Sequence, residues 1–437
     1  MSDPLLTRMM LDAFRDPGDT WIAVADALRA ALLEHARRSC PYWAEVAPPD
    51  TPFARIPPLT KAAMRERWDD LQARGVPEDQ RFEGTTSGST GEPARYANDR
   101  TAVAAHLASY DALRTIAGLP LDAPTLFITT SPTASRAFPP GWITWTAHGL
   151  APEGVPALVE TWSAAERYFV QGRSSMLEWI AHQIELQGLA FENPPLAVVA
   201  SQDMMSAGGR ERIARAFGCP VHSWYGGQET CGMLATTLED GERYAFNPLL
   251  CHVEVVDDEG RPVREGEAGR LLVTDLHNRV CPMIRYDTQD IAVWTAERRG
   301  AWPMIARLEG RSGELLRVRS GRTVSAGALG FWLFAANDFS DLIALWQCLQ
   351  TADDALELRV VWRRPPTAAE ASEIEGAVRA TADPDTRVSV VGIESLGTLP
   401  SGKRWIVRRS PDAGPAPGGA DGQAVPRGFV GPSSGSS

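Results

Sequence analysis

The sequence predicts an α/β protein with a large N-terminal domain built on mostly parallel sheets and a small α+β domain at its C-terminal end. Short apolar runs at 125–129, 196–200 and 221–224 have the length of buried strands. Helical patterns over 174–187 and 207–217 separate these runs. Such alternation is typical of a mostly parallel sheet with helices packed on its faces.

The N-terminal part of the chain is predicted to be helical. Apolar residues recur at three- and four-residue spacing over 5–15 and 23–37. A third helix is expected over 61–71, after the start signal Pro-Pro-Leu-Thr, and a fourth near 101–117.

From His252 onward the pattern changes to strands joined by short turns. Residues 252–256 and Val263, joined by Asp-Asp-Glu-Gly, are predicted to form a hairpin. The other expected elements are strands at 270–274 and 291–294, a pair at 315–319 and 322–325 around a Ser-Gly turn, strands at 356–362, 388–393 and 405–408, and a helix at 367–380.

The domain boundaries follow from these patterns. Residues 1–310 are predicted to form the N-terminal domain, and 311–409 a compact C-terminal domain. Residues 410–437 are rich in Gly, Pro and Ser and have almost no apolar side chains. They cannot bury enough surface to offset the entropy of ordering, so this tail is expected to be disordered.

Composition argues against several classes of protein. The net charge of −12 disfavours a nucleic-acid-binding protein, because neutralising phosphates needs a basic face. No stretch approaches the roughly 18 apolar residues of a membrane span, and the first residues lack the pattern of an export signal. We therefore expect a cytoplasmic protein with no membrane or nucleic-acid partner and reduced cysteines, which could form a homodimer.

Only two of the 43 basic residues are lysines, Lys61 and Lys403. Arginine therefore serves wherever a generic positive charge suffices, but it does not replace a compact, mobile ammonium group. The two lysines invite a chemical explanation, although chance alone would leave a few. Lys61 is interpreted as a helix residue without a catalytic task.

The strongest local motif is the glycine- and hydroxyl-rich run TTSGSTGEP over 85–93. Glycines let the backbone turn tightly and approach a ligand closely, and the interleaved hydroxyl groups suit the phosphate oxygens of a nucleotide. The run is not a Walker loop, because Gly91 is followed by Glu92 instead of lysine. A flexible surface loop is the alternative interpretation.

Four further motifs follow in order along the chain. YGGQE over 225–229 ends a predicted strand, which is where ligands bind in open α/β sheets. The others are RYDTQD over 285–290, EGRSGE over 309–314 and PSGK over 400–403.

This ordered set of five motifs resembles that of the acyl-adenylate-forming superfamily, which includes acyl-CoA synthetases, luciferases and the adenylation domains of peptide synthetases. Three features are most similar to its phenylacetate–coenzyme A ligase branch. They are PPLTK over 57–61, RY at 285–286 and the spacing of GEAGRLLVT over 266–274. The resemblance extends over 50–409.

The resemblance implies a role for each motif. The glycine-rich loop would hold the ATP phosphates through Thr86, Ser87, Gly88, Ser89, Thr90 and Gly91. Tyr225 would stack on adenine and Gly226 would let the backbone approach the acyl phosphate. Glu229 would hold Mg²⁺, a cation that prefers oxygen ligands and bridges phosphates.

The remaining motifs would complete the nucleotide site. Asp290 would bind the ribose hydroxyls, and Arg311 would contact ribose and phosphate. Lys403 would bridge the attacking carboxylate and the α-phosphate, a task suited to an ammonium on a flexible stem. Lys403 and Glu229 are thus the predicted catalytic residues, and the C-terminal domain is implied to be a mobile lid that swings about 311–314.

Three positions depart from the family pattern. Glu92 stands where many relatives carry lysine, although Arg95 follows closely. Gly313-Glu314 replaces a pair of acids at the hinge, and Ser201-Gln202-Asp203 replaces a common Gly-Glu pair at the acyl-pocket wall.

A metal site of another kind is weakly indicated. Cys231, Cys251, His252 and Cys281 are zinc-ligating residue types, but their spacing lacks the tight pairs that are typical of zinc sites.

The sequence therefore predicts an AMP-forming acid–CoA ligase that uses ATP, Mg²⁺ and coenzyme A to activate a small carboxylic acid, aromatic or arylacetic by the branch it resembles. One alternative keeps the adenylation and changes the acceptor to a carrier-protein thiol, an amine or a hydroxyl. Another alternative is a catalytically silent nucleotide-binding homologue, which the changes at Glu92 and Gly313-Glu314 would favour.

Overall fold

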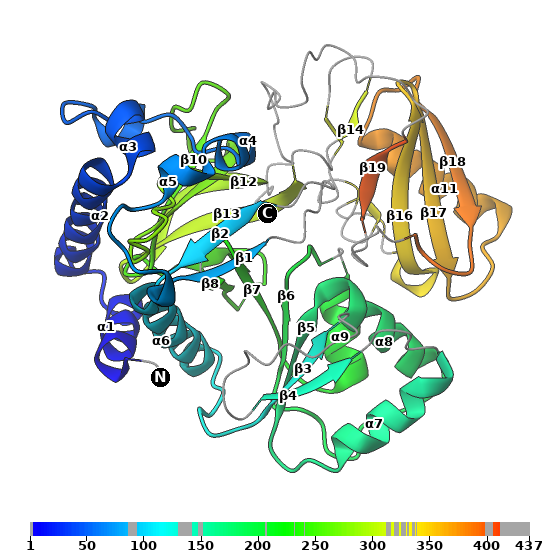
Figure 1. Ribbon diagram of the computed structural model, residues 1–437. Coiled ribbons are helices and arrows are strands. Elements are labelled where there is room, and N and C mark those ends of the chain that lie inside the picture. The colour runs from blue at the N-terminus through cyan, green and yellow to red at the C-terminus, as the bar shows by residue number, and fades with distance from the viewer. Residues whose placement is uncertain are drawn as a thin grey trace. The chain divides into compact units, whose positions relative to one another are not determined.

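The computed structural model has the mixed α/β architecture that the sequence predicts (Figure 1). It describes residues 3–85, 94–129, 142–146, 152–205, 208–230, 232–239, 241–311, 339–397 and 405–410, with short pieces between 316 and 337.

The chain divides into two compact units. The first contains Met1–Leu121 and Trp224–Leu308, and the second contains Asp122–Ser223 and Glu309–Ser437. Each unit is defined by the contacts within it, which do not show which parts of the chain move together. The domains predicted at 1–310 and 311–409 therefore stay a prediction.

The first unit is built on a largely antiparallel sheet with the order β10-β11-β12-β13-β9-β8-β7. Along the chain, β7 begins in the second unit and ends in the first, and β13 does the reverse. The strands are β7 (Val221–Gly227), β8 (Gly232–Thr237), β9 (Tyr244–Phe246), β10 (Cys251–Val256), β11 (Ala268–Asp275), β12 (Tyr286–Arg299) and β13 (Trp302–Arg311).

Six helices of the first unit come from the N-terminal part of the chain. They are α1 (Pro4–Arg15), α2 (Asp19–Ser39), α3 (Pro41–Val46), α4 (Lys61–Glu66), α5 (Trp68–Leu71) and α6 (Arg100–Ile116). Side-chain oxygens of Asp3, Thr60 and Asp99 accept backbone N–H groups at the starts of α1, α4 and α6, which stabilises these ends. The predictions for 5–15, 23–37 and 101–117 are confirmed.

The helix predicted over 61–71 is wrong as a single element. It is broken at Arg67, whose backbone leaves the helical region at φ −118° and ψ 27°. The Arg67 guanidinium donates to Asp70 at 2.6 Å and to Glu45 at 2.8 Å, and these bonds hold the break between α4 and α5.

The core of this region depends on Arg285, which is 1% exposed. Its guanidinium donates to the Glu254 carboxylate at 3.0 Å, to the Ala54 carbonyl at 3.0 Å, to the Gly260 carbonyl at 2.9 Å and to the Ile56 carbonyl. Its backbone has a φ of 48°, which is unfavourable for a residue with a side chain. Arg285 therefore fastens the chain before α4 to the start of β12.

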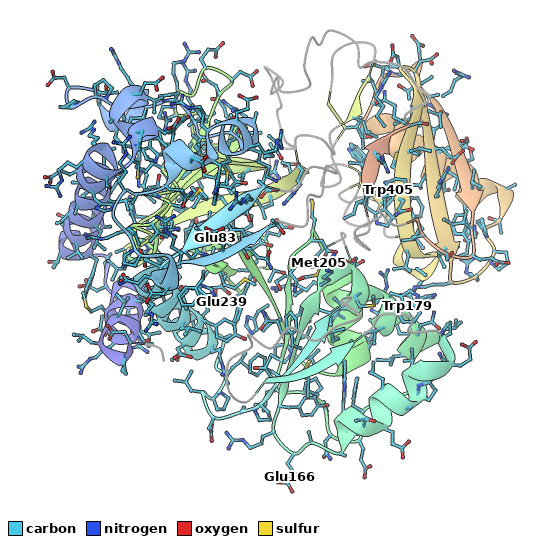
Figure 2. The ribbon with its side chains drawn as sticks, in the orientation of Figure 1. Glu83, Glu166, Trp179, Met205, Glu239 and Trp405 are labelled. Carbon is cyan, nitrogen blue, oxygen red and sulfur yellow. The ribbon has the colours of Figure 1, made fainter. Side chains whose placement is uncertain are left out.

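Two short strands that pair with each other flank the glycine-rich motif in the sequence. β1 (Phe82–Thr85) pairs with β2 (Arg95–Asn98), and Thr85 lies opposite Arg95. Arg95 donates at 2.8 Å to Glu83, which lies on β1 (Figure 2). The Arg95 guanidinium also lies over the Trp68 ring. Arg95, the cation that follows Glu92 in the sequence, thus already has Glu83 as its carboxylate partner.

The second unit contains a parallel sheet with the order β7-β6-β5-β3-β4. Its other strands are β3 (Thr125–Thr129), β4 (Trp142–Thr146), β5 (Phe169–Arg173) and β6 (Val198–Ser201). Helices α7 (Val155–Ser163), α8 (Ser174–Leu186) and α9 (Gly209–Phe217) cover one face with a shared apolar core (Figure 1). The predicted alternation of parallel strands and helices is confirmed.

The same unit contains a four-stranded sheet with the order β18-β17-β16-β19, covered on one face by α11 (Ala368–Ala380) (Figure 1). The strands are β16 (Ile343–Ala352), β17 (Ala355–Trp362), β18 (Arg387–Gly392) and β19 (Val407–Arg409). The strand pair expected around the Ser-Gly turn is present as β14 (Leu316–Arg317) and β15 (Thr323–Val324).

Two features of the strands differ from expectation. β16 was not predicted because Gln347 and Gln350 interrupt its apolar pattern, yet both are fully buried; Gln347 donates to the Gly397 and Trp405 carbonyls. The chain reversal expected between 252–256 and Val263 is present, because the Asp257 N–H donates to the Arg261 carbonyl and the Val263 N–H donates to the Val255 carbonyl. It forms no extended ladder, since Val256 makes an isolated bridge to Pro262 and β10 takes β11 as its strand partner. Proline has no N–H with which to extend a ladder.

The Arg285 contacts lead to a stability prediction. Arg285→Leu should lower the free energy of unfolding by about 3–5 kcal/mol, because Glu254 would stay buried without its cation. The matched control is Arg38→Leu, whose ion pair with Glu34 is largely exposed, and which should cost less than about 1 kcal/mol. Urea unfolding of both variants measures this, and equal small losses would contradict the role of Arg285.

Candidate functional site

The YGGQE motif lies at the end of β7 and in the turn to β8. Gly226 pairs with Met233 across this turn. A Cβ atom on Gly226 would lie 1.7 Å from the Gly232 carbonyl oxygen, so only glycine fits. The close packing of the Gly226 and Gly232 backbones fixes the positions of Tyr225 and Glu229 beside them.

Tyr225 and Asp290 are joined by a hydrogen bond. The Tyr225 hydroxyl donates to Asp290 Oδ2 at 2.6 Å, and the Tyr225 ring lies 5.6 Å from the Phe246 ring between centroids. Both Tyr225 and Asp290 remain partly exposed. The structure therefore brings together the two residues predicted to contact adenine and ribose.

Glu229 is held by a second tyrosine. The hydroxyl of Tyr286, which is 1% exposed, donates to Glu229 Oε1 at 2.9 Å. Within the described residues no hydrogen bond engages Glu229 Oε2, and the carboxylate is only partly buried. A partly exposed carboxylate oxygen fixed by its neighbour fits Mg²⁺, which prefers oxygen ligands and keeps several waters.

The RYDTQD segment is rigidly anchored at the start of β12. Asp287 accepts from Arg270 at 2.7 Å in a buried ion pair, and the Thr288 hydroxyl donates to the Leu271 carbonyl at 2.8 Å. Gln289 has a φ of 66°, a left-handed conformation that costs a residue with a side chain about 1–3 kcal/mol. Strain of this kind is typical of functional sites, and here it aims Asp290 at Tyr225.

Two side chains outside the predicted motifs, His106 and Asn98, also contact the YGGQE turn and the strand that follows it. His106 on α6 accepts the Met233 N–H at Nδ1, at 3.2 Å, and its ring covers the Cα of Gly232. The buried Asn98 on β2 donates to the Gln228 carbonyl at 3.4 Å, and Asn278 in turn donates to Asn98 at 2.9 Å.

Sequence reasoning assigned no role to Tyr286, His106 or Asn98. Tyr286 could have been found, because it stands inside the RYDTQD motif. His106 and Asn98 carry no local signal, since their contacts join positions more than 100 residues apart in the chain.

Seven of the other predicted site residues fall outside the part of the chain that the structure describes, and the eighth belongs to the other unit. Thr86, Ser87, Gly88, Ser89, Thr90, Gly91 and Lys403 lie outside the described residues. Arg311 ends β13 and belongs to the second unit, whereas Tyr225, Gly226, Glu229 and Asp290 belong to the first.

The zinc candidates find no support in the part of the chain that the structure describes. No group of three or more His, Cys, Asp or Glu side chains there could hold a metal ion. Cys251 and Cys281 are buried and unpaired with another cysteine, and burial raises the pKa of both thiols. His252 is engaged by Arg29, and Cys231 lies outside the described residues.

Solved structures of acid-activating enzymes are similar to this chain. A 2-hydroxyisobutyryl-CoA ligase in complex with R3-HIB-AMP matches with a TM-score of 0.69 and 17% identity, over 89% of each chain. The chain has the adenylate-forming fold. This confirms the fold class that the motifs indicated, with its C-terminal sheet subdomain.

Two other structures show the same fold. The anthranilate CoA ligase AuaEII with anthranoyl-AMP matches with a TM-score of 0.54 and 15% identity, over 78% of this chain and 69% of that one. The amide bond synthetase McbA from Marinactinospora thermotolerans matches with a TM-score of 0.53 and 16% identity, over 76% and 69%. No family model and no curated protein matches the chain.

Within the described ranges, no helix combines the length and the apolar character that crossing a bilayer requires.

The partly buried ring of His106 predicts a pH dependence of stability. Burial lowers its pKa to about 4 from the usual 6.5, so the fold favours the neutral ring, which accepts from Met233. This contribution is fully present above pH 6.5 and is lost as the pH falls toward 4, by at most about 1.4 kcal/mol per pH unit.

His106→Asn keeps an acceptor near Nδ1 but cannot titrate. Relative to this variant, the wild-type protein should therefore lose stability between pH 6.5 and 4, as measured by urea unfolding at several pH values. Parallel pH profiles of the two proteins would contradict the assignment.

Proposed function

We propose that this protein is an AMP-forming acid–CoA ligase. It activates a small carboxylic acid with MgATP, releases pyrophosphate, and transfers the acyl group from acyl-AMP to the thiol of coenzyme A. The motifs that resemble the phenylacetate–coenzyme A ligase branch favour an aromatic or arylacetic acid.

The observation that carries this proposal is the pair of tyrosine–carboxylate hydrogen bonds. Tyr225 to Asp290 and Tyr286 to Glu229 join the end of β7 to the start of β12. In this proposal they orient an aromatic ring, a ribose acceptor and a magnesium ligand near the end of β7 and the start of β12, two strands that β8, β9 and β13 separate in the sheet order. The similar structures of 2-hydroxyisobutyryl-CoA ligase and anthranilate CoA ligase, each with an acyl-AMP bound, support the same use of the fold.

Each residue has a defined task in this proposal. The Tyr225 ring stacks on adenine while Asp290 accepts the ribose hydroxyls. Glu229 binds Mg²⁺, which neutralises charge on the phosphates. The glycine-rich segment 86–91 binds phosphate oxygens through its backbone N–H groups, and Arg311 contacts ribose and phosphate.

The chemical step forms a bond between a carboxylate oxygen and the α-phosphorus. The bond from the α-phosphorus to the bridging oxygen of the β-phosphate breaks, and pyrophosphate leaves. In the second step the thiol sulfur attacks the acyl carbon, the thiol proton is lost and AMP leaves. Negative charge gathers around the α-phosphorus, so an ammonium group from Lys403 stabilises the transition state more than the ground state.

An amine is the alternative to coenzyme A as the acceptor of the acyl group. The amide bond synthetase with this fold favours an amine as a second candidate. Incubation of the acid and MgATP with coenzyme A, with a panel of amines, or with neither distinguishes the two, because thioester, amide or accumulated acyl-AMP would be found respectively.

Lys403 provides the test of the adenylation step. Lys403→Ala should lower acid-dependent exchange of pyrophosphate into ATP by about 10²–10³-fold, because one preorganised charge at the reacting phosphate is lost. The matched control is Arg408→Ala, which removes an exposed cation on β19 and should leave the rate within about twofold of wild type.

Several results would contradict the proposal. Undiminished exchange in Lys403→Ala would remove the lysine from the mechanism. ATP binding without any acid-dependent pyrophosphate release, over aryl, arylacetic and aliphatic acids, would instead identify a silent nucleotide-binding homologue.

A further inference from the structure

The loop that joins β11 to β12, residues 276–285, is closed at its base by two hydrogen bonds. The Asp275 N–H donates to the Met283 carbonyl at 3.1 Å, and the Arg285 N–H donates to the Thr274 hydroxyl at 2.8 Å. Because these bonds join the end of β11 to the last residues before β12, a change at Asp275 acts on both ends of the loop.

This loop reaches two adjacent residues of the YGGQE motif by separate routes. Tyr286, which follows the loop, donates its hydroxyl to Glu229 Oε1 at 2.9 Å. Asn278 lies inside the loop and is fully buried, and it donates to Asn98 Oδ1 at 2.9 Å. Asn98 in turn donates to the Gln228 carbonyl at 3.4 Å. The loop therefore contacts the turn that carries the proposed magnesium ligand at two consecutive positions.

The carboxyl group of Asp275, at the start of this loop, has one oxygen without a hydrogen-bond partner. Its Oδ1 accepts the His277 N–H at 2.9 Å. Its Oδ2 is inaccessible and has no partner among the described residues, and Asp275 is only 2% exposed. Burying an ionised carboxylate without a donor for each oxygen is costly, whereas the neutral acid avoids the burial of a charge. This geometry favours the protonated form of Asp275.

The groups around Asp275 also disfavour its ionised form. Burial raises the pKa of Asp275 to about 7, and the Asp99 carboxylate at the start of α6 adds to this effect. The N–H groups of His277 and Asn278 lower the pKa only in part. Cys251, the register partner on β10, has a thiol whose pKa burial raises, and burial lowers the pKa of the His277 ring. Both of these side chains are therefore neutral near pH 7, and neither supplies a positive charge.

We propose that Asp275 is a positioning residue whose proton keeps the 276–285 loop, and through it Gln228 and Glu229, in the geometry that binds MgATP. This inference rests on the proposed function and adds regulation by protons to its nucleotide site. Loss of the proton leaves an uncompensated charge in the core, so the loop opens to admit water and both routes to the turn weaken. MgATP then binds the protonated form more tightly, and its affinity falls as the pH rises through the Asp275 pKa of about 7.

Calorimetry of MgATP binding to the wild-type protein measures this linkage. The titration is carried out in two buffers that differ in their enthalpy of ionisation, which gives the number of protons exchanged. Binding at about pH 8 should take up about 0.5–1 proton per site, and binding at about pH 6 almost none, because Asp275 is already protonated there. Absence of proton uptake at about pH 8 would overturn the inference.

Asp275→Asn assigns the proton to this residue, because the amide stays neutral and keeps an oxygen for the His277 N–H. The ratio of the MgATP dissociation constants, wild type over variant, should rise by about 10- to 30-fold between about pH 6 and about pH 8.5, since only the protonated fraction binds well. The matched control is Asp50→Asn, an exposed carboxylate of the same unit, which should follow the wild type. Parallel profiles of the wild type and Asp275→Asn would contradict the assignment.

Asn98→Ala tests the route through the loop and does not depend on how Asp275→Asn folds. This variant leaves Asp275 in place and removes the bond to the Gln228 carbonyl. Proton uptake on MgATP binding at about pH 8 should fall to less than about half of the wild-type value, because the loop then acts on the turn through Tyr286 alone. Unchanged uptake would overturn the proposed transmission.

The two proposals fail in distinguishable ways. MgATP binding with no proton uptake and with equal pH profiles would overturn the role of Asp275 and leave the ligase proposal intact. Absence of MgATP binding at every pH would overturn the proposed function, and this inference with it.

Discussion

The geometry of the candidate site in the first unit depends on two hydrogen bonds from tyrosine hydroxyls to carboxylates. They join the end of β7 to the start of β12, strands that β8, β9 and β13 separate in the sheet order. Each bond orients a carboxylate that would otherwise rotate freely in water. Glu229 Oε2 accepts no hydrogen bond from the described residues, and Asp290 is held beside an aromatic ring. The function that we propose needs such preorganised groups, because the protein contributes positioning and charge to a reaction between two anions.

The surrounding residues explain why these bonds have one geometry. The buried pair of Arg270 with Asp287 and the strained backbone of Gln289 fix the β12 side. His106 and Asn98 fix the β7 side through backbone contacts to Met233 and Gln228. Hydrogen bonds and ion pairs that are buried in this way restrict the positions of the groups they join.

The sequence predicted the fold class and the parallel sheet, and four of its candidate site residues lie in one unit, where their roles stay predictions. Alternating strands and helices, together with motifs in a fixed order, carry that information. It could not predict β16, because Gln347 and Gln350 look like surface residues, although both are buried and Gln347 bonds to Gly397 and Trp405. It also missed His106 and Asn98, whose roles arise only when distant segments meet, and it overlooked the break at Arg67, which depends on Glu45.

The coupling between Tyr286 and Glu229 tests the central claim most directly. It is measured by a double-mutant cycle on MgATP affinity with Tyr286→Phe, Glu229→Gln and the double variant, by calorimetry at fixed ionic strength. If the tyrosine acts by orienting the carboxylate, the cycle gives a coupling energy of about 0.5–3 kcal/mol, and Tyr286→Phe has little effect once Glu229 is replaced. Strictly additive losses, or MgATP affinity that no variant changes, would contradict this account.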